Sequence, residues 1–268
     1  MTVPFTKAHA YGNDFLYVLS RDVRGLPPDS LARELCDRHT GIGADGLILF
    51  TPTADGASIE LFNADGGRAE VSGNGVRGLG ALLLRHDETE GVTVTVHTQA
   101  GSKAMVRTSR ERSRQTFRSA MGLPRELRQT RIDAAGESLP IVIMDFGNPQ
   151  AVIVGTLPAA DRFQRLGPAL ERHPAFPQGT NVEFAEVLAP DSIQILIWER
   201  GVGPTTSSGT GSCASLIAAA EFGGAARDAT VMAPGGAQRV EWLADSVYLT
   251  GWAEVLFDGE WLREIANC

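Results

Sequence analysis

Long apolar runs, an excess of positive charge and paired cysteines are all missing from this sequence. No apolar run approaches the ~18 residues of a membrane-spanning helix, and the opening MTVPFTKAHAYGNDF lacks the apolar core of a signal peptide. Lys and Arg number 24 against 32 Asp and Glu, a net charge of −8, which argues against nucleic-acid and anionic-membrane partners. These absences predict a soluble, cytoplasmic protein.

The three cysteines, Cys36, Cys213 and Cys268, are scattered and have no CxxC spacing. Such a set predicts neither a disulfide framework nor a zinc site, so we expect no metal. Glycine, by contrast, is abundant, with 30 residues, and marks places where the backbone turns tightly or approaches a ligand. The 268 residues are enough for one large domain or two of moderate size.

The sequence contains an internal repeat, in which short motifs of the first half recur in the second half. SGNG at 72–75 matches SGTG at 208–211, and 208 − 72 = 136. Three further pairs of short motifs follow at nearly the same shift: 43–45 with 179–181, 62–63 with 198–199, and 12–13 with 147–148. Four matches in the same order indicate an internal duplication. We therefore expect a first half at 1–115 and a second at 116–255, with the C-terminal tail at about 256–268 packing back on the first half.

Local patterning predicts the same elements in both halves. A helix with few charges in its middle turns follows each SGxG, at 76–85 and 212–222, as expected for a helix enclosed by a sheet. An outer helix precedes each of them, at 30–39 and 160–172. Runs of β-branched and aromatic residues predict strands at 15–19, 47–50, 58–62, 92–98, 102–106, 141–146, 151–154, 182–187, 193–198, 230–232 and 247–250. The basic run RTSRERSR at 107–114 is expected in an exposed turn or edge strand near the domain junction.

Each Ser-Gly-polar-Gly turn opens a buried helix, the first at Ser72 and the second at Ser208. The first N–H groups of a helix lack internal partners, and the helix dipole places partial positive charge there. Glycines let an anionic ligand approach those N–H groups closely. For either turn alone, simple N-capping by the serine hydroxyl is the alternative. Two such turns at equivalent positions favour a ligand gripped from opposite sides at the domain junction.

Polar side chains at strand ends and in turns fit that interpretation. An arginine binds a carboxylate bidentately, a glutamate pairs with an ammonium group, and an α-amino acid presents both. A single asparagine in a turn is commonly structural, so the prediction depends on the whole set. Its members are Asn13, Asn63, Asn148, Asn181, Glu199 and Arg200.

Seven motifs occur in order over nearly the whole chain: KAHAYGNDF, GIGADG, FNADG…GNGVR, HTQAG, GNP, GTNVEF and ERGVG…SGTG. In these motifs the sequence resembles the diaminopimelate epimerase family. The resemblance implies an α/β (α+β) fold of two pseudo-symmetric halves, each a curved, mostly antiparallel sheet or barrel wrapped around a central helix, with the active site in the cleft between them. It implies interconversion of LL- and meso-2,6-diaminopimelate, a lysine and peptidoglycan precursor, with neither pyridoxal phosphate nor metal as cofactor. It also suggests a homodimer.

The resemblance further implies the site residues. Substrate contacts are expected at Asn13, Asn63, Asn148, Asn181, Glu199 and Arg200, and backbone amides that hold the reacting carboxylate at Gly73, Asn74, Gly209 and Thr210. The family moves the α-proton with two cysteines, and those positions here are Ser72 and Ser208. The family histidine after GNP is Gln150, the glutamate expected in the GxGxT run is Pro204, and Gly46 stands where some members carry a glutamine.

The serines change the expected chemistry. A cysteine, with a pKa of about 8.5, becomes a thiolate with modest help, whereas an alcohol is a far weaker acid and needs a neighbouring base. Glu199, expected beside Ser208, is the one strong candidate for that base. Three hypotheses remain: an epimerase homologue with natural or introduced serines, an isomerase or dehydratase that uses a single base on another amino-acid-like substrate, and a non-catalytic amino-acid binder.

Overall fold

The computed structural model describes residues 2–262 and divides into two compact units. Unit 1 runs to Ser119 and resumes at Gly251, and unit 2 spans Ala120–Thr250. Both boundaries fall inside strands, β8 (Arg114–Gly122) and β17 (Val247–Trp261), so each of these strands contributes to both units. Of the expected tail at 256–268, residues 263–268 lie outside the described part of the chain.

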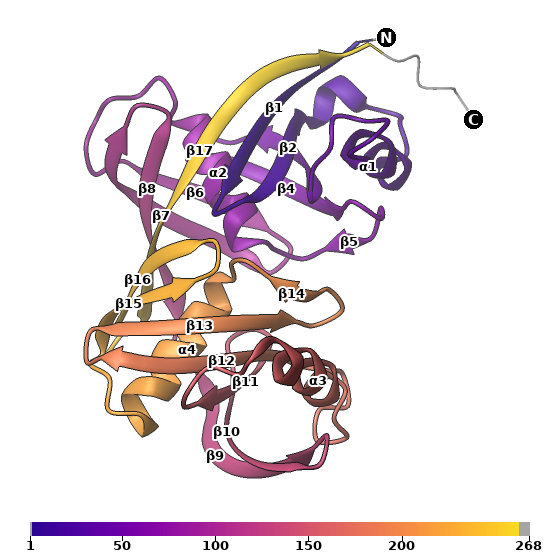
Figure 1. The fold of residues 1–268 in the computed structure, drawn as a ribbon. Coiled ribbons are helices and arrows are strands. Elements are labelled where there is room, and N and C mark those ends of the chain that lie inside the picture. Colours follow the sequence, from indigo (N-terminus) through magenta and orange to yellow (C-terminus); the bar gives the residue numbers. More distant parts are fainter. Residues whose placement is uncertain (1, 263–268) are drawn as a thin grey trace. The chain divides into compact units, whose positions relative to one another are not determined.

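Unit 1 is a closed barrel of eight strands (Figure 1). Its strands pair in the order β1-β2-β3-β4-β6-β7-β8-β17, and β17 returns to β1. Its elements up to β8 are β1 (Val3–Ala10), β2 (Asn13–Leu19), the 3-10 helix η1 (Ser20–Val23), α1 (Pro28–Cys36), β3 (Gly46–Pro52), β4 (Gly56–Asn63), β5 (Arg68–Ala69), α2 (Gly73–Leu83), β6 (Thr93–Thr98) and β7 (Gly101–Glu111).

Unit 2 repeats this order of elements. They are β9 (Arg125–Ala134), β10 (Glu137–Asp145), β11 (Pro149–Val154), α3 (Ala160–Glu171), β12 (Asn181–Ala189), β13 (Ser192–Glu199), β14 (Gly203–Thr205), α4 (Gly209–Phe222), β15 (Asp228–Ala233) and β16 (Gly236–Trp242). The pairings repeat as well: β2–β3 and β4–β6 are parallel, and so are their counterparts β11–β12 and β13–β15. The duplication expected from the sequence is thus present in the topology.

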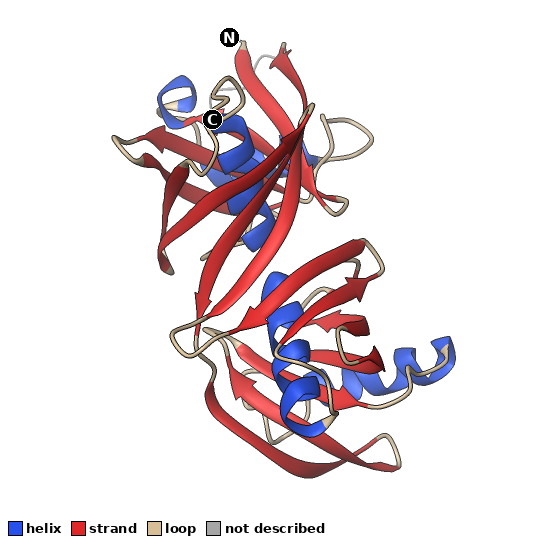
Figure 2. Ribbon diagram, turned by 90° about the vertical axis from the view of Figure 1, so that its left-hand side faces the viewer, coloured by secondary structure: helices blue, strands red, loops and turns tan. Residues whose placement is uncertain are grey.

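A helix of small residues fills the centre of each unit (Figure 2). In α2, a Cβ on Gly78 would lie 2.1 Å from the Tyr17 hydroxyl oxygen, and one on Gly80 would lie 2.8 Å from Met105 Cε. In α4, every residue from Gly211 to Ala219 is buried. A helix enclosed on all sides has no polar face, and the close approach of the surrounding strands accounts for the glycines. The expected fold class, two similar halves each wrapped around a central helix, is confirmed.

The outer helices cover a second apolar layer in each unit. Leu31 and Leu35 of α1 pack with strand residues such as Leu47, and Leu166 and Leu170 of α3 do the same in unit 2. Both helices begin with an acidic residue in the first turn, as the helix dipole favours.

The boundaries of the central helices differ from those expected. Both begin three residues earlier than predicted, at Gly73 and Gly209, because the serine before each is the N-cap and the glycines form the first helical turn. Strands β1, β5, β8, β9, β14 and β16 were not predicted. In β8 and β9, exposed and charged residues weaken the alternating pattern. Within the basic run, Arg107 is buried rather than exposed, and it donates to the Leu84 carbonyl and to Gln115 Oε1, both at 3.0 Å.

Candidate active site

The two serine turns have the same geometry. Ser72 is the N-cap of α2, with φ −130° and ψ 121°, and its Oγ accepts the Gly75 N–H at 3.1 Å. Ser208 is the N-cap of α4, with φ −141° and ψ 127°, and its Oγ accepts the Gly211 N–H, also at 3.1 Å. Each serine therefore caps its helix, while the hydroxyl proton stays available to another acceptor.

The third residue after each serine must be small, for different reasons in the two units. A Cβ on Gly75 would lie 2.8 Å from Ile48 Cδ1 of the core. A Cβ on Gly211 would lie 2.7 Å from Glu183 Oε1 and 3.1 Å from Ser208 Oγ. The first turn of α4 thus has a carboxyl group packed against it, close to the capping hydroxyl.

In unit 1, the predicted asparagines gather at one end of three adjacent strands. Asn13 begins β2 and Asn63 ends β4, and β3 pairs with both of these strands, with Gly46 opposite Asn63. Asn74, in the first turn of α2, donates to Asn13 Oδ1 at 3.2 Å. Asn13 in turn donates to Asp45 Oδ2 at 2.7 Å. Asn13 and Asn74 are therefore joined by a direct hydrogen bond, and Asn63 lies at the same end of the sheet.

In unit 2, four polar residues interlock at the start of β11 and β12. Gln150 Nε2 donates to Asn148 Oδ1 at 2.7 Å, and Gln150 pairs with Asn181 across the parallel strands. Asn181 Oδ1 accepts the Arg200 N–H at 2.9 Å, and its Nδ2 lies 3.3 Å from the Pro149 carbonyl. These bonds hold Asn148, Asn181 and Arg200 as one group. Thr210 Oγ1 lies 3.5 Å from Ser208 Oγ.

Two glutamates of unit 2 are close to each other, and one of them, Glu183, lies against the Ser208 turn. Glu199 ends β13, where burial raises its pKa and the Thr205 side chain partly opposes that rise. Glu183 of β12 is fully buried, and burial together with the nearby charge of Glu199 raises its pKa well above the usual value. Burial favours the protonated form of both carboxyl groups, and the charge of Glu199 adds to this effect on Glu183. The pair is suited to hold and release a proton.

Asp45, Glu183 and Arg77, whose Nη2 donates to Asn74 Oδ1, were not predicted as site residues. Asp45 and Arg77 stand inside the motifs GIGADG and GNGVR, and Glu183 interrupts an otherwise apolar strand in NVEF. A buried charge in an apolar run is a usable signal, but their partners become visible only in the fold. Neither cysteine within residues 2–262 belongs to the serine turns: Cys36 is the buried last residue of α1, where burial raises its pKa to about 12, and Cys213 is buried within α4.

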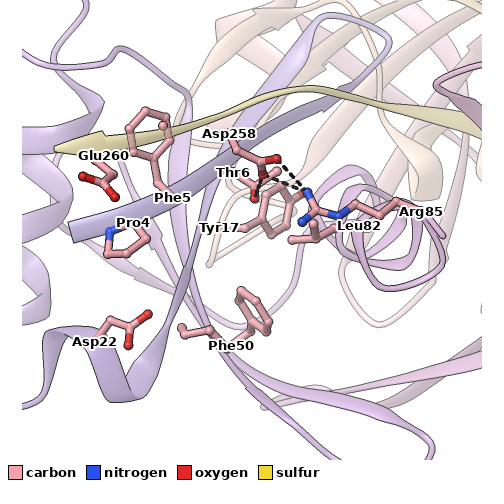
Figure 3. A pocket seen from close by; sticks show the side chains of 12 residues that line it. Pro4, Phe5, Thr6, Tyr17, Asp22, Phe50, Leu82, Arg85, Asp258 and Glu260 are labelled. Atoms are coloured by element: carbon pink, nitrogen blue, oxygen red, sulfur yellow. Dashed lines mark hydrogen bonds and ion pairs between the residues drawn. The ribbon is translucent and has the colours of Figure 1, made fainter. Parts of the chain in front are cut away.

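A pocket of unit 1 lies elsewhere and is a weaker candidate (Figure 3). Its walls include Phe5, Phe50 and Leu82, and none of the predicted site residues lines it. Its arginine, Arg85, is paired with Asp258 at 2.8 Å. Because its cation is already paired, the pocket offers less to a charged ligand than the serine turns do.

A comparison with protein families decides the affiliation. The family model of diaminopimelate epimerase matches residues 5–125 and 142–256. The chain belongs to the diaminopimelate epimerase family. A diaminopimelate epimerase of Desulforudis audaxviator is 40% identical over 97% of this chain and 99% of its own. Diaminopimelate epimerase 1 of a Nostoc species is 38% identical over 97% of this chain and all of its own.

Solved structures show the same fold at low sequence identity. A structure described as a predicted epimerase from Pseudomonas aeruginosa superposes with a TM-score of 0.75 at 16% identity, covering 98% of this chain and 100% of that one. A probable proline racemase from Agrobacterium radiobacter gives 0.72 at 17% identity, over 99% and 93% of the two chains. The family and its relatives indicate an epimerase or racemase.

Ser72 and Ser208, expected from the sequence at the two proton-transfer positions, both use their hydroxyl oxygens to cap helices. Gly46 has no room for a side chain, because a Cβ there would lie 2.7 Å from the Phe62 carbonyl oxygen. Over residues 2–262, no cluster of His, Cys, Asp and Glu could hold a metal ion, and no helix is long and apolar enough to cross a membrane.

Proposed function

We propose that this diaminopimelate epimerase family member binds LL- and meso-2,6-diaminopimelate and exchanges the α-proton without pyridoxal phosphate or metal. One observation carries the proposal: Ser72 and Ser208 cap the central helices of the two duplicated units with the same geometry. We propose that these two serines stand at the family's proton-transfer positions. Family membership and relatives named diaminopimelate epimerase support the choice of substrate.

Binding is proposed to use both helix N-termini on one substrate molecule. The first-turn N–H groups at Gly73, Asn74, Gly209 and Thr210 would hold the α-carboxylate, since helix N-termini favour anions. The remaining charged groups of the substrate would contact the polar residues of the two units: Asn13, Asn63, Asn148, Asn181, Glu199 and Arg200.

Proton transfer is proposed to be slow and to favour the Ser208 side. A serine hydroxyl stays protonated at neutral pH, so it donates a proton readily but accepts one poorly without a base. In unit 2, Glu183 lies against the turn of Ser208, and Glu199 lies close enough to Glu183 to perturb it. In unit 1, the cation Arg77 bonds to Asn74 of the Ser72 turn. The base is therefore expected on one side only.

The deciding experiment is α-proton exchange in D2O with LL-diaminopimelate, for this chain and for its Ser72→Cys/Ser208→Cys variant. We expect the cysteine variant to exchange at least ~100-fold faster, because a general base near neutral pKa contributes about 10²–10⁴-fold. Both forms should bind the substrate. Binding without exchange in either form would point to an amino-acid binder, and absence of binding in both would refute the proposal.

A one-base isomerase or dehydratase on a related amino acid is a second candidate, favoured by the gathering of Glu183 and Glu199 in unit 2. The stereochemistry of the product separates the two. A single base delivers deuterium to the same face of the α-carbon from which it removed the proton, so exchange occurs with retention of configuration. An epimerase delivers deuterium to the opposite face, so exchange occurs with inversion.

Glu199 itself can be tested in the same assay. We expect Glu199→Gln to abolish exchange by the serine form, since it removes the one base that the sequence pointed to. Because burial raises the Glu199 pKa, the parent's exchange should rise with pH through a range above about 4.3, the ordinary value for glutamate. A pH profile and rate unchanged in the variant would exclude Glu199 as the base.

A further inference from the structure

A chain of three side-chain hydrogen bonds runs through unit 1 beside the Ser72 turn. Arg77 of α2 donates from Nη2 to Asn74 Oδ1. Asn74 donates from Nδ2 to Asn13 Oδ1 at 3.2 Å, and Asn13 donates from Nδ2 to Asp45 Oδ2 at 2.7 Å. We call these four residues the amide relay. They join the first two turns of α2 to the start of β2 and to the loop before β3.

The two ends of the relay fix its direction. An asparagine amide can in principle turn over and exchange its oxygen with its nitrogen, but a guanidinium has no acceptor, so Asn74 must present its oxygen to Arg77. Asp45 accepts from the Asp14 N–H at 3.0 Å and from Arg38 Nη2 at 2.8 Å, so both of its oxygens act as acceptors. Asn13 must therefore present its nitrogen to Asp45.

Both ends are held in place by their surroundings. Arg77 is 3% exposed, and its guanidinium carbon lies 5.8 Å from the centre of the Tyr11 ring. A Cβ on Gly251 would lie 3.3 Å from that same carbon, so strand β17 packs directly against it. At the other end, Arg38 also binds Asp14, at 2.7 Å. The amides between these ends have little freedom to turn over.

The direction decides what the two amides offer to a ligand. In both Asn13 and Asn74, the side-chain oxygen accepts one hydrogen bond and one N–H donates another within the relay. The second N–H of each amide has no partner among the residues that the structure describes. What each side chain still offers is one N–H donor, while its oxygen already accepts one hydrogen bond and keeps a single lone pair.

Resting on the proposed function, we infer that Arg77 and Asp45 are positioning residues that fix the orientation of the Asn13 and Asn74 amides, so that each offers one N–H to a ligand and unit 1 selects a carboxylate over the matching carboxamide. A carboxylate offers acceptors to both donors, whereas a carboxamide sets its own N–H groups against one of them. A buried donor left without an acceptor weakens binding.

The test compares the affinity of LL-diaminopimelate with that of its diamide by calorimetry. The variants are Arg77→Met and Asp45→Asn, which release the two ends, and Arg77→Lys, which keeps a donor-only cation. Arg85→Met is the matched control, because Arg85 follows the far end of α2 and pairs with Asp258. We expect the preference for the diacid to fall about tenfold in Arg77→Met and Asp45→Asn, and to stay within about twofold in the other two.

A merely structural role gives a different result. If Arg77→Met and Asp45→Asn lose affinity or thermal stability but keep the full preference for the diacid, the inference is overturned. Asp45→Asn keeps the test open should Arg77→Met fail to fold, because the Asp45 side chain is 41% exposed and the substitution is isosteric.

Failure of the proposed function can be told apart from failure of the relay. If the parent binds neither the diacid nor the diamide, the substrate proposal fails, and the relay is then judged without ligand by the side-chain amide signals of Asn13 and Asn74 in nitrogen-15 NMR spectra. Arg77→Met should shift the amide signals of both asparagines, whereas Arg77→Lys should shift neither pair strongly. An Asn13 pair that does not respond to Arg77→Met would overturn the inference.

Discussion

At the scale of single residues, two buried glutamates of unit 2 respond to their surroundings in opposite ways. Burial and the Glu199 charge raise the pKa of Glu183. Burial also acts on Glu171, but hydrogen bonds from Trp198 Nε1 at 2.8 Å and from the Gly201 N–H at 2.9 Å outweigh it and lower the pKa. The presence or absence of donors at the carboxylate, rather than burial alone, sets the direction.

The two glutamates should therefore give opposite dependences of stability on pH. Glu183 binds its proton more tightly in the folded state, so its contribution to stability is fully present below the unfolded pKa of about 4.3 and is lost as pH rises toward the folded pKa. We expect Glu183→Gln to lose less unfolding free energy than the parent between about pH 5 and pH 8. Urea unfolding at the two pH values measures this, at about 1.4 kcal/mol per unit of pKa difference.

Glu171→Gln is the matched control, with the opposite sign. Its lowered pKa contributes stability that is present above about pH 4.3 and is lost as pH falls through the folded value. The free energy of unfolding of this variant should be lower than that of the parent at neutral pH. On acidification it should fall by less than that of the parent. The same pH response in both variants would contradict the assigned directions.

The capping serines predict a conflict between stability and activity. A Ser N-cap replaced by Ala costs about 1 kcal/mol, and a thiol is a weak acceptor. We expect Ser72→Cys and Ser208→Cys each to lower the unfolding free energy by up to about 1 kcal/mol while raising the rate of proton exchange. Chemical unfolding and exchange on the same samples test it. A cysteine variant both more stable and faster would show that the caps contribute little.

At the scale of elements, the central helices show why glycine outweighs helix propensity. Alanine is about 1 kcal/mol better than glycine inside a helix, yet a Cβ on Gly78 would meet the Tyr17 hydroxyl, which donates to the Gly75 carbonyl at 2.9 Å. At Gly80 the atom met is the terminal methyl of Met105, a flexible group. Steric cost and propensity thus compete differently at the two positions.

We expect Gly78→Ala to destabilise unit 1 by about 1–3 kcal/mol, because overpacking a rigid aromatic ring exceeds the gain in propensity. Gly80→Ala should lie within about 1 kcal/mol of the parent, since Met105 can move aside. Thermal unfolding of the two variants side by side is the measurement. Equal effects would mean that the ring of Tyr17 gives way as easily as the methionine.

How far the sequence predicts these elements depends on where the information lies. The central helices and the duplication were predictable because the SGxG turns and their apolar sequels are local signals. The amide relay was not, because Asn13 bonds to Asp45 and Asn74 across 32 and 61 residues of chain. Strand β9 was missed for a similar reason: its charged residues are acceptable because β10 pairs with it along most of its length.

At the scale of the whole molecule, the duplication does not produce two independent pieces of chain. Closure of the unit 1 barrel requires β17, which pairs with β1. The pairing runs from Glu254, opposite His9, to Trp261, opposite Val3. The corresponding partner of β10 in unit 2 is β9, which follows β8 directly. Only unit 1 therefore depends on a segment from the opposite end of the sequence.

This dependence predicts how the chain can be cut. A fragment of residues 2–122 lacks β17 and leaves an edge of β1 unpaired, so we expect no cooperative thermal unfolding. Trp261 lies opposite Val3 in the antiparallel pair, so a turn of about four residues can join 262 to 2. The permuted chain 247–262–turn–2–122 should regain a cooperative transition, followed by circular dichroism. A control with the 247–262 segment scrambled should stay unfolded, because the register with β1 and not the added length closes the barrel. Cooperative folding of 2–122 alone would mean that the core around α2 is sufficient without closure.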